Sequence, residues 1–229
     1  MGVAAEREDG RVVSVRPASV VDGVYENIYE RLMSLEIAPG ARIPIDAIAR
    51  DLNVSQTPVR EALSRLDREG LVRKAHLIGF SAAPQLTRKQ FDDLYTLRLL
   101  LEPEGARLAA LNMTPAALKT LEEAAADMGR GELPVDRTSR YSRFARADAD
   151  FHDEILKIAG NEVIRSTLFN QHVHLHIFRL MFHSRVTQEA LEEHEGLLAS
   201  FRAGDAAAAE NAMRVHISRS RDRLLAAFE

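Results

Sequence analysis

Residues 54–72 read VSQTPVREALSRLDREGLV, and this stretch decides the fold of the N-terminal part of the chain. Ser55 suits a helix N-cap, and Pro58 then falls in the first turn, where its missing N–H loses no intrahelical hydrogen bond. Four apolar residues at helical spacing predict one buried stripe: Val59, Ala62, Leu63 and Leu66. The stretch therefore predicts a helix that starts at about Gln56 and ends before Gly70.

The polar N-terminal end of this helix is rich in hydrogen-bond donors. Free N–H groups at a helix start, hydroxyls, an amide and a guanidinium can contact phosphates and base edges in a major groove. Before it, IDAIARDLNV (45–54) predicts a shorter helix and a turn, and after it LVRKAHLIGFSAA (71–83) predicts a two-stranded ribbon. Together the pieces predict a winged helix-turn-helix, whereas the stretch alone is equally compatible with an ordinary surface helix.

The stretch LNVSQTPVREALSRLDREGLV resembles the winged helix-turn-helix signature of the GntR family of bacterial transcription regulators, and the match covers about residues 20–83. The resemblance implies a set of residues that contact double-stranded DNA: Ser55, Gln56, Thr57, Arg60 and, at the tip of the wing, His76. It also implies that Arg60 contacts a guanine and that the hydroxyls hold phosphates.

Two positions depart from the family pattern. Gln56 replaces a frequent arginine, which shifts the expected base preference toward adenine. Asp46 stands where some members have a DNA-contacting arginine, so no contact is expected there.

From Leu86 onward the apolar pattern is helical almost to the end of the chain. It predicts six helices, with seven as the alternative, at about 87–111, 114–128, 138–159, 161–183, 187–203 and 205–228. The expected fold class is therefore mainly α, a winged helix followed by an antiparallel all-α bundle. The expected domains are a flexible arm at 1–17, the DNA-binding domain at 18–83 and the helical domain at 84–229, with the junction at Pro84.

Four polar residues in the helical part have the spacing of a metal site. Asp148 and His152 are four residues apart and share a helix face. His194 and His216 lie in two later helices among apolar residues, so both are expected to face the bundle interior. Three imidazoles and a carboxylate suit zinc or another divalent ion. Taken singly, each histidine is more often a hydrogen-bonded core residue.

A second histidine cluster competes with the first. HVHLH contains His172, His174 and His176, of which the first and last are one helical turn apart. It is the second choice, because no carboxylate lies one turn away on that face. The sequence assigns no role to these three residues or to His183.

The helices over about residues 88–225 resemble the FCD ligand-binding domain that accompanies this winged helix in the FadR branch of the GntR family. The resemblance implies that Asp148, His152, His194 and His216 hold a divalent metal, zinc first, with nickel or manganese as alternatives. It also implies that the metal helps to bind a small carboxylic acid effector. A count of six helices would place the chain in the VanR-like subgroup.

Arg98 matches the arginine of the family's first long helix, which implies a role in effector binding. A guanidinium inside a bundle needs an anion, and a bound carboxylate supplies one in bidentate geometry. An ion pair with Glu102, one turn further on, is an equal alternative.

Composition limits the classes of function. The chain has 229 residues, 46 % of them hydrophobic, and a net charge of -4, so any nucleic-acid surface must be local. The absence of cysteine excludes disulfides and thiolate metal ligands. No run reaches the roughly 18 apolar residues of a membrane span, and the N-terminus lacks a signal peptide's apolar core. A soluble cytoplasmic protein with no membrane partner is expected.

The sequence thus predicts a ligand-responsive transcription regulator, a repressor rather than an enzyme. A homodimer on an inverted-repeat operator is expected, because one winged helix contacts only a few base pairs. Three alternatives remain: a metal-dependent enzyme domain fused to a DNA-binding domain, a metal sensor without an organic effector, and a regulator with a purely structural metal.

Overall fold

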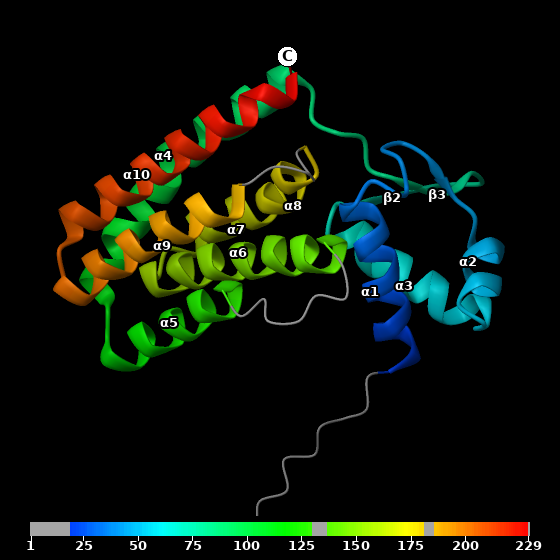
Figure 1. Ribbon diagram of the computed structural model, residues 1–229, viewed down its shortest axis with the longest axis horizontal. Coiled ribbons are helices and arrows are strands. Elements are labelled where there is room, and N and C mark those ends of the chain that lie inside the picture. The colour runs from blue at the N-terminus through cyan, green and yellow to red at the C-terminus, as the bar shows by residue number, and fades with distance from the viewer. Residues whose placement is uncertain (1–18, 130–136, 181–185, 229) are drawn as a thin grey trace, which may run out of the picture.

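The computed structural model describes residues 19–129, 137–180 and 186–228. The arm expected at 1–17 and His183 lie outside this range. The chain forms a small N-terminal domain and a larger helical domain, and helix α1 (Val20–Met33) lies between the two (Figure 1). The fold class predicted from the sequence is confirmed.

The N-terminal domain is a winged helix-turn-helix. Its other elements are β1 Arg42–Ile43, α2 Ile45–Asp51, α3 Gln56–Arg68, β2 Val72–Ala75 and β3 Gly79–Ala82. The strands form one antiparallel sheet in the order β1-β3-β2, with Lys74 opposite Phe80. The predicted ribbon is therefore confirmed. Strand β1 was not predicted, because two residues are too short to show an alternating pattern.

Helix α3 begins and packs as its sequence predicts. It starts at Gln56, and the side chains of Val59, Ala62, Leu63 and Leu66 are fully buried. Ser55 occupies the N-cap position, but its hydroxyl makes no capping hydrogen bond. That hydroxyl is therefore not committed to stabilising the helix start.

The C-terminal domain contains seven α-helices in the described part of the chain. They are α4 Arg88–Asn112, α5 Pro115–Gly129, α6 Arg137–Ala159, α7 Glu162–Phe169, α8 Val173–Phe178, α9 Val186–Ala203 and α10 Ala206–Leu224, followed by a 3-10 turn at Leu225–Phe228.

For the part of this domain that the structure describes, the alternative prediction of seven helices is therefore the correct one. The single helix expected at 161–183 is broken between α7 and α8, where His172 adopts a left-handed conformation with a φ of 48°. The count of six that pointed to the VanR-like subgroup does not hold.

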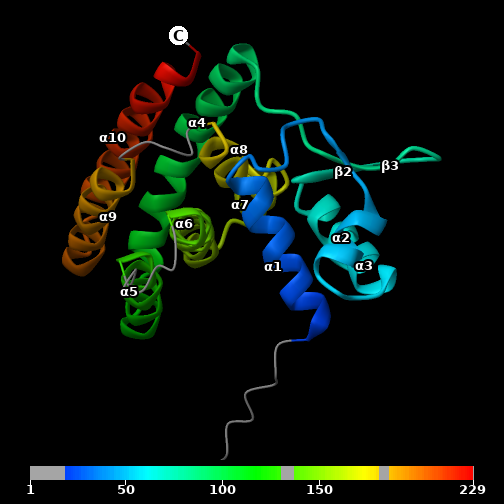
Figure 2. The same cartoon turned by 45° about the vertical axis from the view of Figure 1, so that its right-hand side comes forward.

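Helices α4 and α10 lie side by side along one edge of the bundle, as both ribbon views show (Figures 1 and 2). The end of the chain returns to the start of α4, where the rings of Phe91 and Phe228 are 5.1 Å apart between centroids. Helix α6 packs between α4 and α5 and also contacts α9 through the core, so it is central to the domain.

Helix α6 also contacts the DNA-binding domain through α1. The guanidinium of Arg146 lies 4.1 Å from the ring centre of Tyr29 and donates a hydrogen bond of 2.7 Å to Glu26. The hydroxyl of Tyr29 donates to the backbone carbonyl of Ser142 at 3.2 Å. The two domains are therefore joined by directional contacts as well as by the linker.

A second contact joins the domains at the end of α3. Gly70 has a φ of +73°, and a β-carbon built on it would lie 2.4 Å from Cδ2 of His172. Two residues with left-handed backbones, one from each domain, thus pack directly against each other. Glycine at position 70 is required both by its φ and by the imidazole that faces it.

We expect Gly70→Ala to destabilise the protein more than Gly40→Ala. Gly40 has a similar φ of +76° but nothing within 4 Å of its built β-carbon, so its substitution measures the backbone cost alone, about 1–2 kcal/mol. Urea unfolding followed by circular dichroism would measure both. The excess cost at position 70 should disappear in a His172→Ala background; an undiminished excess would show that this contact is not its cause.

Candidate metal centre and DNA-binding surface

The four predicted ligands converge in the core of the helical domain. Asp148 and His152 come from α6, His194 from α9 and His216 from α10, and each is at most 4 % exposed. One nitrogen from each histidine lies within 4.8 Å of those from the other two. Asp148 Oδ1 is 3.5 Å from His194 Nε2. Sequence spacing therefore identified residues that do meet at one point.

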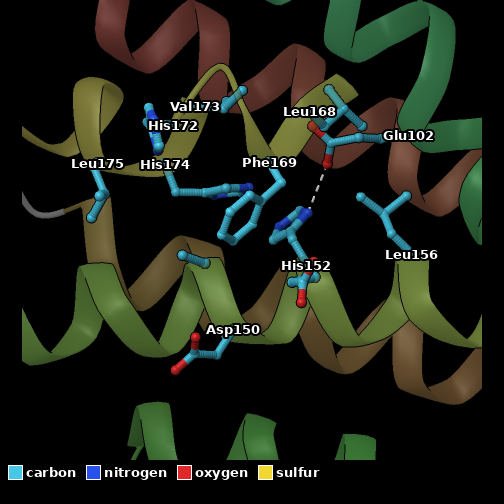
Figure 3. A pocket seen from close by; sticks show the side chains of 12 residues that line it. Glu102, Asp150, His152, Leu156, Leu168, Phe169, His172, Val173, His174 and Leu175 are labelled. Atoms are coloured by element: carbon cyan, nitrogen blue, oxygen red, sulfur yellow. Dashed lines mark hydrogen bonds and ion pairs between the residues drawn. The ribbon is translucent and has the colours of Figure 1, made fainter. Parts of the chain in front are cut away.

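Two carboxylates fix the orientation of two of the imidazoles. Glu102, on α4, lies 2.7 Å from Nδ1 of His152, the contact drawn in Figure 3. Glu193, on α9, lies 2.8 Å from Nδ1 of His216. An ionised carboxylate can only accept a hydrogen bond, so each Nδ1 carries the proton and each Nε2 keeps its lone pair. This is how metal-binding histidines are commonly held.

Several ring nitrogens of the cluster have no hydrogen-bond partner although they are buried. These are Nε2 of His152 and both nitrogens of His194. A buried polar atom without a partner costs free energy, which a bound cation would offset for the nitrogens that face it. Three imidazoles and one carboxylate are a donor set typical of zinc and similar divalent ions. The residues present therefore fit such an ion.

The electrostatics of the cluster favour the metal-binding protonation states. Burial is the main reason that the pKa of each of His152, His194 and His216 lies below its ordinary value, so all three are neutral at pH 7. Burial opposes ionisation of Asp148, but the hydrogen bond from His174 and the electrostatic effects of His174, His152 and His194 together outweigh burial, so the pKa of Asp148 is lowered. Little proton release would therefore accompany metal binding.

Sequence reasoning missed three residues that surround the cluster. Glu102 and Glu193 orient imidazoles, and His174, on α8, places its Nδ1 2.8 Å from Asp148 Oδ2. Within the described residues, neither His172 nor His176 belongs to a group of potential metal ligands. The competing HVHLH cluster thus contributes only its middle histidine, which is a partner of Asp148 and also forms a second group of possible metal ligands with Glu102 and His152.

Arg98 is 2 % exposed and paired with Glu102, with 2.5 Å between Nε and Oε1. The alternative ion pair therefore exists, and the effector role of Arg98 stays a prediction. Arg98 also lines a small cavity of about 20 Å³ beside the cluster, here called the polar chamber. Its polar lining residues are Arg98, Asp148, His174, His216, Ser220 and Arg223.

The predicted DNA contacts all lie on the surface of the N-terminal domain. Ser55, Gln56, Thr57 and Arg60 are exposed at the start of α3, where Arg60 donates to Gln56 Oε1 at 3.3 Å. His76 is exposed in the turn between β2 and β3, the tip of the wing. A helix start and a wing tip that are both open to solvent have the arrangement needed to contact a duplex.

Comparison with known proteins identifies both domains. The family model for bacterial regulatory proteins of the gntR family matches residues 21–81, and the FCD domain model matches residues 93–219. The chain belongs to the GntR family. Its combination of domains is consistent with the FadR-like branch.

Individual relatives agree with this assignment. The chain is similar to the HTH-type transcriptional regulator LutR of Bacillus subtilis, with 29 % identity over 85 % of this chain and 96 % of LutR. It is 30 % identical, over 80 % of this chain and 81 % of the relative, to a probable D-xylose utilization operon transcriptional repressor of Paenarthrobacter nicotinovorans. The structure of Escherichia coli McbR/YncC shares the fold, with a TM-score of 0.67, 21 % identity, and coverage of 93 % of this chain and 100 % of McbR.

This GntR-family protein is therefore a bacterial transcription regulator with an FCD effector-binding domain, not an enzyme. Members of the family bind DNA operators through the winged helix, so the exposed residues of α3 belong to the expected DNA-binding surface. Over the ranges that the structure describes, no helix is long and apolar enough to cross a membrane.

We expect Glu193→Gln to weaken zinc binding by roughly 10- to 100-fold, because a neutral amide holds the His216 ring less firmly than a carboxylate. Glu192→Gln, at the exposed neighbouring position on α9, is the matched control and should bind zinc as the wild type does. Competition titration with a chromophoric chelator would measure both affinities. Equal affinities for the two variants would show that Glu193 does not support a metal ligand.

Proposed function

We propose that this regulator is a repressor whose FCD domain binds a divalent metal ion and a small carboxylate effector. The observation that carries the proposal is the buried cluster of Asp148, His152, His194 and His216 with unpartnered nitrogens. Its action as a repressor is supported by the similarity to the probable transcriptional repressor of Paenarthrobacter nicotinovorans.

Asp148 and the three histidines would hold the metal, with zinc as the first choice and nickel or manganese as alternatives. A bound divalent ion would supply positive charge and coordination positions that oxygen ligands can occupy. The carboxylates of Glu102 and Glu193 and the imidazole of His174 would keep the ligands oriented, through the hydrogen bonds they already make.

The polar chamber is the proposed site of the carboxylate. Two guanidinium groups, those of Arg98 and Arg223, line it beside Asp148 and His216. Arg98 is paired with Glu102 and Arg223 with Glu193, but Nε of Arg223 is buried without a partner. A carboxylate placed there would meet donors of matching geometry.

Binding an acid must rearrange the chamber walls. A volume of about 20 Å³ holds roughly one water molecule, which is less than a carboxylic acid requires. His174, which lines the chamber and donates to Asp148, is a wall that can move, because it is only partly buried and lies on the short helix α8. Effector binding would therefore displace side chains rather than fill an empty space.

The contacts between the domains offer a route from this site to DNA. Helix α6 carries Asp148 and His152, and two residues before Asp148 it carries Arg146, which contacts α1. An effector alters operator binding only if its affinity differs between the two states of the protein, typically by about 1–3 kcal/mol. A homodimer on an inverted repeat would convert a change in domain spacing into a loss of operator affinity.

The small size of the polar chamber favours a second candidate, a metal sensor in which the ion itself is the signal. The two functions differ in what releases the operator. Release by zinc alone, unaffected by carboxylic acids, would support the metal sensor.

We expect the purified protein to contain a divalent metal by elemental analysis. We further expect that one or more small acids from a panel such as lactate, succinate and citrate will raise the thermal midpoint, because at a hundredfold excess over Kd a ligand adds about 3 kcal/mol to the free energy of unfolding by mass action. A chelator should abolish the rise. A rise that survives the chelator, or that persists in His194→Ala, would contradict a metal-supported acid site.

We expect Arg60→Ala to reduce operator affinity by about 1–3 kcal/mol and to relax the preference at one base pair, as for an arginine that contacts a guanine. Arg68→Ala, at the opposite end of α3, is the matched control and should change operator affinity little. Fluorescence anisotropy with operator duplexes altered at single positions would measure both. If Arg60→Ala weakens binding to all duplexes equally, Arg60 contacts only a phosphate.

A further inference from the structure

A second cavity shares the wall residue His174 with the polar chamber. It is here called the apolar chamber, and its volume is about 130 Å³. Half of its twelve lining residues come from the end of α7, the start of α8 and the connection between them, and five come from α6 (Figure 3). Its apolar wall residues include Leu156, Leu168, Phe169, Val173 and Leu175.

The size and lining of the apolar chamber limit what can occupy it. A cavity of about 150 Å³ lined by leucine, isoleucine and phenylalanine binds one benzene molecule. The apolar chamber is slightly smaller, and six of the twelve residues that line it have aliphatic or aromatic hydrocarbon side chains. A single six-membered ring therefore fits it, whereas a larger ring system would protrude.

The charges around the apolar chamber exclude an anion. Among the described residues, no lysine or arginine lines it. Three carboxylates line it. Glu102 is paired with Arg98 and His152, and Asp153 is held by Arg165 through two contacts of 2.8 Å. Asp150 points away from the histidines in Figure 3. A carboxylate ligand would find no counter-charge there, in contrast to the polar chamber with its two guanidinium groups.

An exposed aromatic ring marks the rim of the apolar chamber. Phe169, the last residue of α7, is 62 % exposed, and in Figure 3 its ring points toward the side of the chamber where His152 and His174 lie. Aromatic rings associate in offset or edge-to-face arrangements and gain free energy when water leaves their faces. An aromatic ligand would cover the exposed face of Phe169.

We propose that the apolar chamber is a second ligand site, which binds a neutral monocyclic aromatic compound without requiring the metal or the carboxylate effector. The site bears on regulation because His172, which lines it, packs against Gly70 at the end of α3. A ring seated in the chamber would touch the same α7–α8 connection that contacts the DNA-binding domain.

Benzyl alcohol is the probe, and its binding to the full chain is measured by ligand-observed NMR titration. We expect Phe169→Ala to weaken binding roughly three- to tenfold, the range expected for one lost aromatic contact. Val163→Ala, an exposed position on the same helix that does not line the chamber, is the matched control and should leave binding unchanged. Both side chains are exposed, so neither substitution should impair folding.

Two further arms separate this site from the carboxylate site. Benzyl alcohol should bind equally well after a chelator has removed any metal, and benzoate, which has the same ring but carries a charge, should not compete for it. Undetectable binding, equal affinities of the two variants, loss of binding with chelator, or competition by benzoate would each overturn the proposal. The metal-dependent response to aliphatic acids is measured in a separate experiment, so either proposal can be rejected while the other is retained.

Discussion

The burial of four polar groups at one point determines how the helical domain is arranged. Three imidazoles and a carboxylate cannot remain without partners in a bundle core, because each unpaired polar atom costs free energy. The surrounding helices meet part of this demand, since α4 contributes Glu102, α9 contributes Glu193 and α8 contributes His174. Both ring nitrogens of His194 keep no hydrogen-bond partner. The hydrogen bonds that orient these side chains thus also join the helices of the bundle to one another.

The sequence predicts features that depend on neighbours along one helix. The buried stripe of α3 and the shared face of Asp148 and His152 follow from helical spacing alone. Features that depend on which helices meet were not predictable: nothing in the sequence places Glu193 beside His216, or His174 beside Asp148. The break between α7 and α8 was missed because it rests on a left-handed histidine, a conformation without a reliable local signal.

His174 divides the interior of the helical domain into two environments. The polar chamber contains Asp148, His216 and two guanidinium groups, whereas the apolar chamber contains aliphatic side chains, an exposed phenylalanine and His152. Both environments adjoin structures that contact the DNA-binding domain, the first through Arg146 on α6 and the second through His172. The imidazole of His174 would therefore contact both proposed ligands, and each ligand could change how the two domains are arranged.

The close approach of Gly70 and His172 also constrains how this chain can change over generations. A side chain cannot be added at position 70 while the imidazole occupies the space 2.4 Å from the new β-carbon. A smaller residue at position 172 would remove this clash, but the left-handed backbone of position 70 would still favour glycine. The residue at position 172 and the residue at the end of α3 are therefore expected to change together rather than independently.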